Sequence, residues 1–293
     1  MPFVTPDQHE HSYDAIIVGS GAAGGQTAYT LCMEGARVLM LEAGRRYVPE
    51  AETPMFYTPD QAPLGGMSTP QKPFGFYDAT VDGGWQVPGE PYVLTREDHA
   101  GRFEWWRARM LGGRTNHWGR ISLRMGPYDF KPYSRDGLGF DWPVDYDEIA
   151  PYYDKVELLI GVYGSNEGLE NTPNSGAGCL LPPPQPLVAD RLIAQRARRL
   201  GLPVIPGHRA VLTQKLDFRN SPARLHPGNH KAQQILAQAM RERAACLWAT
   251  PCGTGCSVRA NYQCTTVQLP PALASGNMQI TTDAMVYEIS LGA

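Results

Sequence analysis

Three glycines near the start of the chain have the spacing of a phosphate-binding turn. Gly19, Gly21 and Gly24 fill the positions of G-x-G-x-x-G, and Glu42 follows about 20 residues after the turn. In such a turn the first glycine allows the tight bend, the second lets the main chain approach a pyrophosphate, and the third allows close helix packing. The acid is placed to accept hydrogen bonds from ribose hydroxyls. The predicted dinucleotide-binding residues are Gly19, Ser20, Gly21, Ala22, Ala23, Gly24, Glu42 and Ala43.

A second group of residues suited to ligand contact lies at positions 112–119. Gly112 and Gly113 precede four polar or aromatic residues, Thr115, Asn116, His117 and Trp118. A glycine-rich backbone that carries such side chains is typical of a loop that approaches a ligand closely.

The elements that must position these residues follow from the hydrophobic pattern of residues 13–47, YDAIIVGSGAAGGQTAYTLCMEGARVLMLEAGRRY. Residues 14–18 are predicted to form a buried strand, residues 22–34 a helix that Gly35 ends, and residues 37–41 a second strand. The positive end of the helix then faces the phosphates. A glycine-rich turn by itself can connect a strand and a helix without binding a ligand. The complete order of strand, glycine turn, helix, second strand and Glu42 predicts nucleotide binding. It does not distinguish FAD from NAD.

Composition excludes several classes of protein. The chain has 293 residues, 42% of them hydrophobic, and a net charge of -3, with no stripe of Lys and Arg to bind nucleic acid. Residues 191–199 are the most basic stretch and are expected to be the solvated face of a helix. No apolar run approaches the roughly 18 residues that span a bilayer. No secretory signal is visible, which favours the cytoplasm, although co-export with a signal-bearing partner into the periplasm is an alternative.

With these motifs in place, the chain resembles the glucose-methanol-choline (GMC) oxidoreductases, most closely the bacterial branch of gluconate and polyol dehydrogenase flavoprotein subunits. Besides the two glycine segments, residues 141–162, DWPVDYDEIAPYYDKVELLIGV, and residues 269–289, LPPALASGNMQITTDAMVYEI, are similar to stretches of that branch. The resemblance implies an α/β fold with a Rossmann-like, glutathione-reductase-like FAD-binding domain. That domain would comprise residues 1–130 and 255–293, and residues 131–254 would form an inserted α+β cap on the substrate side.

The resemblance also implies roles for individual residues. The flavin half of FAD would lie against Gly112, Gly113, Thr115, Asn116, His117 and Trp118, and the backbone of Val286 would lie near the adenine. His117 either bonds covalently to the flavin, as in the pyranose oxidases, or only hydrogen-bonds the ring or its own loop, which we favour. Arg114 and Arg120 stand where the similar sequences have Ser and Gly. Either they attract the pyrophosphate, or the loop geometry differs.

The implied reaction is oxidation of an alcohol, a sugar, a sugar acid or a polyol by FAD, in which a base takes the hydroxyl proton and hydride passes to flavin N5. In the family that base belongs to a histidine pair near the C-terminus, which this sequence does not contain, so we expect an N-terminal part that binds FAD poorly and oxidises no alcohol by itself. An electron-acceptor subunit is a possible partner. The alternatives are another FAD- or NAD-binding enzyme and a non-catalytic remnant.

Four of the six cysteines are close together in the sequence. Cys246, Cys252, Cys256 and Cys264 follow the pattern C-x5-C-x3-C-x7-C, which matches no standard metal-site spacing. We expect structural or free thiols and no metal, with an iron-sulfur cluster as the alternative. His208, His226 and His230 are expected to be surface or packing residues, because no acidic partner stands near them in the sequence.

Overall fold

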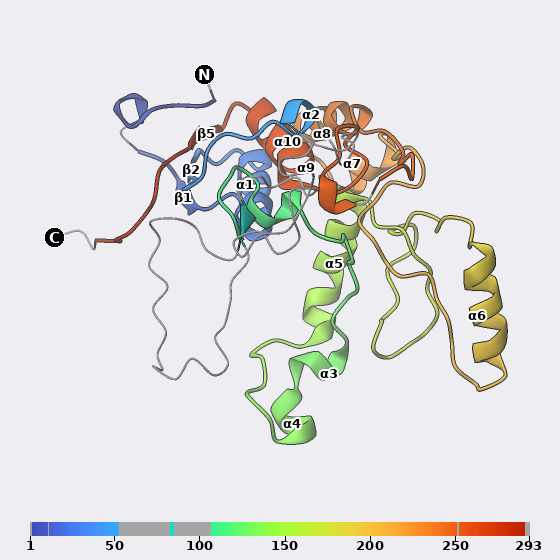
Figure 1. Ribbon diagram of the computed structural model, residues 1–293. Helices are drawn as coiled ribbons and strands as arrows, with labels where there is room; N and C mark the ends of the chain where they lie inside the picture. The colour runs from blue at the N-terminus through green and yellow to red at the C-terminus, as the bar shows by residue number, and fades with distance from the viewer. Residues whose placement is uncertain (1, 11, 53–82, 85–106, 251, 291–293) are drawn as a thin grey trace.

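The computed structural model describes residues 2–10, 12–52, 83–84, 107–250 and 252–290. Its centre is a parallel sheet of three strands in the order β1-β2-β5, formed by Ala15–Val18, Val38–Leu41 and Met278–Thr281. Ala15 of β1 pairs with Val38 of β2, which in turn pairs with Met278 of β5. Strands from the two ends of the chain therefore lie side by side (Figure 1). This arrangement confirms the predicted α/β class, with a Rossmann-like parallel sheet.

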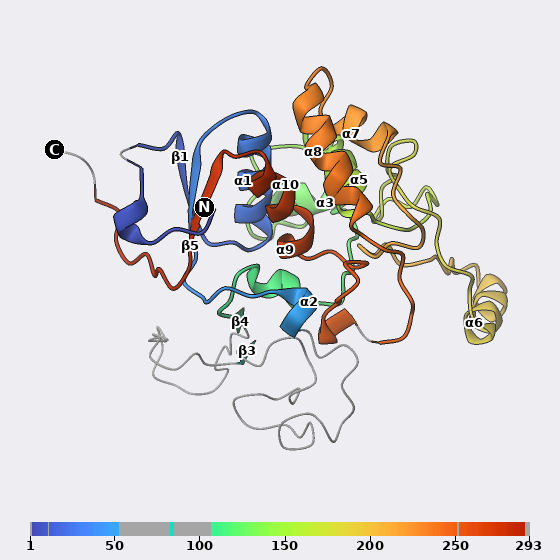
Figure 2. The same ribbon diagram turned by 90° about the horizontal axis from the view of Figure 1, so that it is seen from above.

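Helix α1 (Ala22–Met33) connects β1 to β2 and packs on the sheet. Two short helices, α9 (Cys264–Val267) and α10 (Leu269–Ala274), lie beside α1 on the same side of the sheet (Figure 2). The buried side chains between helices and sheet include Ala28, Cys32, Val38, Met40 and Ile280. The predicted strand-helix-strand unit is thus confirmed, with boundaries within one residue.

The prediction that the first strand is buried is wrong. Ile16 and Val18 of β1 are 61% and 56% exposed. The reason is that β1 lies at the outer edge of the sheet, where β2 is its strand neighbour among the described residues. Of Ile16, Ile17 and Val18, only Ile17 belongs to the core beside α1. The opposite edge, at β5, is covered by the N-terminal segment, where Val4 N donates to Ile280 O at 3.0 Å.

Strand β5 is short, and the chain leaves the sheet after it. β5 ends at Thr281, and Asp283 has a positive φ of 56°. The chain then turns toward the end of β2, where Asp283 N donates to Gly44 O and Ala284 N to Glu42 O, each at 2.9 Å. After Thr281, these two main-chain hydrogen bonds take the place of further β-strand pairing.

A second core lies on the other face of α1. Tyr29 and Met33 of α1 pack there with residues of the predicted cap, including Leu159 and Leu236. The helices that contribute are α5 (Tyr146–Ile160), α7 (Asn220–Leu225) and α8 (His230–Arg241). At the start of α5, the main-chain N–H of Asp145 donates to Glu148 Oε2. The predicted cap and the strand-helix-strand unit therefore share a core.

Helix α6 (Val188–Arg198) projects from the body of the molecule (Figure 1) and has no buried side chain. It confirms the helix that the basic stretch predicted. No helix in the described part of the chain has the length and apolarity to cross a membrane. The domain boundaries remain a prediction, and residues 53–82 and 85–106 of the first predicted domain lie outside the described residues.

The other elements are short. They are α2 (Pro49–Glu52), β3 (Gly83–Gly84), β4 (Arg107–Ala108), α3 (Pro127–Phe130), α4 (Pro132–Asp136) and the 3-10 helices η1 (Pro6–Gln8), η4 (Gly113–Asn116) and η5 (Cys252–Thr254). Of these, η4 and η5 matter most below, because they carry the loop residues of the candidate site and the cysteines behind it.

Candidate functional site

The glycine turn, residues 19–24, is built as its spacing predicts. Gly19 has a φ of +87°, which favours glycine, and a β-carbon added to Gly24 would lie 2.0 Å from Gly19 O. The third glycine therefore lets α1 pack directly on the turn. By contrast, a β-carbon added to Gly19 or Gly21 would meet no atom of the described residues within 4 Å. On its outer side, the turn therefore has open space in the part of the chain that the structure describes.

The first turn of α1 offers hydrogen-bond donors to that space. Its N-cap residue is Gly21, so no side chain caps the helix. The N–H groups of Ala22, Ala23 and Gly24 have no partner within the helix, because such partners would precede its first residue. Free N–H groups and the positive end of the helix dipole together favour a phosphate.

The Gly112 loop, residues 112–119, meets this turn, as expected. Gly112 N donates to Ser20 Oγ at 2.8 Å, across 92 positions of sequence. A β-carbon added to Gly113 would lie 3.8 Å from the Cα of Gly21. Gly112 and Gly113 both have positive φ, at 89° and 49°, so the backbone needs glycine at both positions. The two motifs that the sequence predicted independently therefore lie at one place.

Glu42 is buried at the end of β2 and holds the turn in position. Its Oε2 accepts hydrogen bonds from Ser20 N at 2.8 Å and from Ser20 Oγ, and its Oε1 accepts from Gly44 N at 2.8 Å. A carboxylate can accept about four hydrogen bonds. These three contacts leave capacity for one more donor, so the predicted contact with a ribose hydroxyl stays compatible with the geometry but is not the main task of Glu42.

Thr115 and Asn116 turn their side chains into the protein. Thr115 Oγ1 donates to Gly112 O at 2.6 Å and accepts from Cys264 N at 3.0 Å. Asn116 Nδ2 donates to Leu111 O at 2.9 Å. Both residues stabilise the loop from within, so any contact they make with a ligand comes from the main chain.

His117 and Trp118 end the η4 turn. His117 is buried, and its main-chain N–H donates to Arg114 O at 3.3 Å. The Trp118 ring packs edge to face on Tyr262, with centroids 6.0 Å apart, on the side of the second core. A contact between His117 and a flavin, covalent or hydrogen-bonded, stays a prediction.

Arg114 and Arg120, the two arginines of the Gly112 loop region, have different environments. Arg120 is fully buried with a φ of 60°, the left-handed conformation that explains glycine at this position in similar sequences. Its guanidinium donates to five main-chain carbonyls, those of Thr115, Asn116, Trp118, Cys252 and Tyr262. Burial lowers the pKa of Arg120 to about 10, so it stays charged at neutral pH. Arg120 therefore holds the Gly112 loop from behind, whereas Arg114 is exposed.

The structure adds two positions that the sequence motif did not single out. A β-carbon on Gly25 would lie 2.1 Å from Cys264 Sγ, and one on Gly44 would lie 2.3 Å from the backbone of Arg109 and Met110. Both glycines allow the close approach of elements that carry the site. The predicted residue Val286 is half-buried and follows Ala284, which is bonded to Glu42 O.

The histidines of the cap are mostly internal. His208 is buried, with Nε2 3.0 Å from Ser165 O. The expectation that no acid accompanies His226 is wrong, because Glu34 Oε1 lies 3.6 Å from its Nδ1 and Tyr29 Oη lies 2.6 Å from its Nε2. The sequence separation of nearly 200 residues hid this contact. All six cysteines are free, and no group of three or more potential metal ligands occurs within the described residues.

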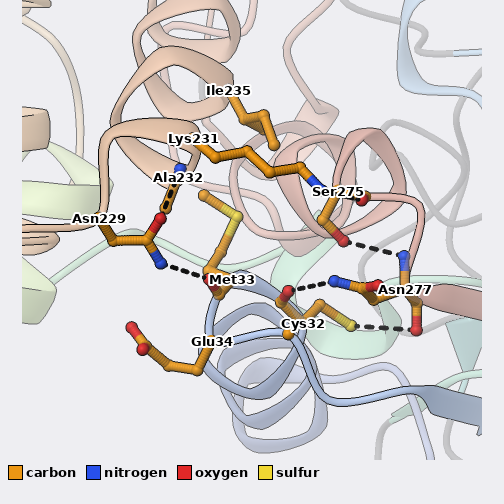
Figure 3. Close-up of a pocket in the computed structure, with 10 residues that line it drawn as sticks. Cys32, Met33, Glu34, Asn229, Lys231, Ala232, Ile235, Ser275 and Asn277 are labelled. Atoms are coloured by element: carbon orange, nitrogen blue, oxygen red, sulfur yellow. Dashed lines mark hydrogen bonds between the residues drawn. The ribbon is translucent and has the colours of Figure 1, made fainter.

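A cavity of about 140 Å³ lies at the other end of α1, away from the glycine turn (Figure 3). Its polar groups are already paired. Asn229 Nδ2 donates to Met33 O, Asn277 Nδ2 to Cys32 O and Lys231 Nζ to Ser275 O. The arrangement is that of a stabilised helix end, so the candidate site is the glycine turn.

Parts of the chain are similar to known oxidoreductases. The chain is 32% identical over 159 residues to paromamine 6'-oxidase of Streptomyces fradiae, covering 53% of this chain and 24% of that protein. It is 32% identical over 166 residues to the fructose dehydrogenase large subunit of Gluconobacter japonicus, covering 56% and 30%. It is 26% identical over 277 residues to 2-methyl-1,2-propanediol dehydrogenase of Mycolicibacterium austroafricanum, covering 92% and 45%. The chain thus spans less than half the length of these relatives. No family model matches it.

Proposed function

We propose that this chain, which belongs to the glucose-methanol-choline (GMC) oxidoreductase family, forms the FAD-binding part of an enzyme that oxidises a hydroxyl-bearing carbon of a small molecule. FAD is the cofactor of the family. The observation that supports the proposal most directly is the hydrogen bond of 2.8 Å from Gly112 N to Ser20 Oγ. It joins the two loops that a single extended cofactor would have to contact.

The residues around this junction fit FAD. The donors on the first turn of α1 have no side-chain cap, and the space outside Gly19 and Gly21 is open. A diphosphate supplies the negative charge that such a helix end favours. We assign the diphosphate to the N–H groups of Ala22, Ala23 and Gly24, and one ribose hydroxyl to the remaining acceptor capacity of Glu42.

The chain's own residues then perform binding and orientation. When bound, FAD supplies the electron sink for hydride removed from the alcohol carbon. Gly112 and Gly113 bring the main chain close to the flavin half, and Thr115 and Asn116 fix that backbone through their internal hydrogen bonds. Arg120 closes the loop from behind. A rigid loop of this kind aligns the flavin relative to the substrate. We assign no residue of this chain as the base.

For the substrate we propose a small polyol or sugar. The names of two relatives specify fructose and 2-methyl-1,2-propanediol, and each of these compounds carries more than one hydroxyl group. The relative named as a large subunit supports a second proposal, that electrons pass to a partner subunit. The compartment would follow from that partner: the periplasm with a signal-bearing subunit, the cytoplasm otherwise.

The assignment of the diphosphate is tested by Gly21→Ala in the full-length protein. Gly21 has an ordinary φ of -66° and free space around it, so the variant should fold normally. The added methyl group enters the space assigned to the diphosphate, and we expect about tenfold weaker FAD binding, which is about 1.4 kcal/mol. The measurement is titration of the apoprotein with FAD, followed by flavin fluorescence.

The matched control is Gly207→Ala, a glycine that also has open space and no positive φ but lies in the cap. Its FAD affinity should equal that of the unaltered protein. Unchanged affinity in Gly21→Ala would remove the assignment. A protein that binds NAD and shows no visible flavin absorbance would instead favour the nicotinamide alternative.

A further inference from the structure

Helix α6 stands apart from the rest of the molecule. Figures 1 and 2 both show it at the periphery, and none of its side chains is buried. Of its 11 residues, only Ala194 and Ala197 are partly covered. These two alanines are three positions apart and lie on one side of the helix. The opposite side is therefore the one turned most fully to solvent.

That outer side of α6 carries the larger apolar side chains. Val188, Leu192 and Ile193 are 75%, 56% and 59% exposed. Val188 and Leu192 are four positions apart and share a stripe of the helix surface, and Ile193 lies beside it. A surface helix ordinarily buries such residues and exposes its polar ones. Because α6 exposes them instead, the structure indicates a contact surface here.

Positive charge surrounds these apolar side chains. The exposed arginines of α6 and its C-terminal end are Arg191, Arg196, Arg198 and Arg199. Within the described residues, their side chains have no hydrogen bond or ion pair. The acidic residue of the helix, Asp190, is engaged at its start, where Oδ2 accepts from Leu187 N at 2.8 Å. The whole chain has a net charge of -3, so the positive charge of α6 is a local feature.

The apolar surface continues beyond the ends of the helix. Leu187 precedes α6 and is 71% exposed, and Leu200 and Leu202 follow it at 75% and 58%. Leu202 N donates to Ala197 O at 3.0 Å, so the segment after the helix folds back against its last turn. Exposed leucines therefore lie at both ends of the same projecting element.

We propose that α6 binds the surface of a lipid bilayer that contains anionic phospholipids, with the helix lying flat at the level of the headgroups. Apolar side chains of such a helix enter the boundary between headgroups and acyl chains, and its arginines are attracted to the negative surface. With 11 residues, α6 is too short to span the hydrocarbon core of roughly 30 Å.

An acidic protein surface would also attract the arginines. The exposed apolar side chains, however, extend from Leu187 to Leu202 along one isolated element. A fluid interface accepts them without a groove of matching shape, which favours the bilayer. This role is separate from the proposed FAD site and does not depend on it.

The test is binding of the full-length protein to sedimented vesicles. Equal parts of phosphatidylglycerol and phosphatidylcholine supply an anionic surface, and phosphatidylcholine alone supplies a neutral one. We expect binding to the anionic vesicles, weakened by added salt because salt screens exposed charges, and little binding to the neutral ones. The double variant Arg196→Gln/Arg199→Gln should bind about 25-fold more weakly, about fivefold for each arginine.

The double variant Leu192→Gln/Ile193→Gln tests the apolar contribution. Its binding should weaken about tenfold and keep its salt dependence, because the arginines remain. The altered positions are exposed, so the midpoint of unfolding should not change in either variant. The matched control is Arg219→Gln/Arg241→Gln, which removes the same charge beside α7 and at the end of α8. It should bind the vesicles as the unaltered protein does.

Three outcomes overturn the proposal. The full-length protein could leave anionic vesicles unbound, bind both kinds equally, or bind as tightly without Arg196 and Arg199 as the control variant does. Self-association of the protein that Leu192→Gln/Ile193→Gln abolishes, without any vesicle binding, would assign the outer side of α6 to a second copy of the chain instead.

Discussion

The two ends of helix α1 are treated in opposite ways. At the N-terminus, Gly21 provides no side-chain cap, and the first-turn N–H groups have no partner within the helix. At the C-terminus, Gly35 has a φ of +97° and its N–H donates to Cys32 O at 3.1 Å, while Ala36 N donates to Leu31 O at 3.0 Å. This pair of bonds is a Schellman motif, which satisfies carbonyls that the helix itself leaves free.

Side chains from distant parts of the chain complete the C-terminal end. Asn229 Nδ2 donates to Met33 O at 3.0 Å, and Asn277 Nδ2 donates to Cys32 O at 2.9 Å (Figure 3). The same Asn229 begins α8, because its Oδ1 accepts from Ala232 N at 3.1 Å. One residue therefore satisfies two helix ends at once.

The contrast separates stability from binding. A helix end whose polar groups are all paired stabilises the fold, whereas an end with unpaired donors costs stability until a ligand pairs them. The cavity at the C-terminal end lies among groups that already have partners. The N-terminal end has the donors, the glycines and the second loop. Changes at the two ends should accordingly have different consequences.

The largest effect is expected from Gly24→Ala. The added β-carbon would lie 2.0 Å from Gly19 O, so α1 must move away from the glycine turn. We expect a loss of about 3 kcal/mol or more in the free energy of unfolding, together with the loss of FAD binding. Denaturant unfolding of the apoprotein and FAD titration measure the two effects.

Gly35→Ala is the matched change at the other end. It meets no atom within 4 Å and is strained only by its positive φ, so it should cost about 1–2 kcal/mol. The affinity for FAD should not change. Equal losses of affinity in the two variants would contradict the division of α1 into a binding end and a stability end.

The strand-helix-strand unit could be predicted from sequence because its signals are local. The glycine spacing, the helix stop at Gly35 and the flanking apolar runs all lie within about three dozen residues, and each agrees with the others. The exposure of Ile16 could not be predicted in this way. The exposure of Ile16 depends on whether another strand or helix covers β1. The spacing of apolar residues in the sequence does not show which strand lies at the edge of a sheet.

The site shows the same limit. The meeting of Gly112 with Ser20 was expected from the resemblance to a family, not from the spacing of either motif. The burial of Arg120 was not foreseen, because its five acceptors are main-chain carbonyls, which leave no trace in residue types. The contact of His226 with Glu34 likewise joins residues that are far apart in the chain.

A smaller effect is expected from Asn229→Ala. The change removes the cap of α8 and the donor to Met33 O, and we expect a loss of about 2 kcal/mol in the free energy of unfolding. Asn277→Ala should cost less, about 1 kcal/mol, because Cys32 O keeps its bond from Gly35 N. Neither variant should alter the affinity for FAD. A larger loss of stability in Asn277→Ala than in Asn229→Ala would contradict this account of the hydrogen bonds at the C-terminal end of α1.

The smallest effect concerns the pH dependence of stability at the same end of α1. His226 is in contact with Tyr29 and Glu34 of the α1 region, and the positive charge of Lys155 in α5 acts on it. Burial lowers the pKa of His226 below its ordinary value of 6.5, Glu34 opposes this shift, and Lys155 adds to it. The unfolded chain therefore binds more protons than the folded one in mildly acidic solution. Stability should be full above pH 6.5 and fall as the pH decreases below it.

Glu34→Gln sharpens this prediction, because it removes the group that raises the pKa of His226 and leaves burial and Lys155 unopposed. The loss of stability below pH 6.5 should become steeper than in the unaltered protein, whereas His226→Gln should remove this part of the pH dependence altogether. Denaturant unfolding in buffers between mildly acidic and neutral pH measures the slope. A shallower slope in Glu34→Gln would mean that the contact with Glu34 does not favour the charged histidine.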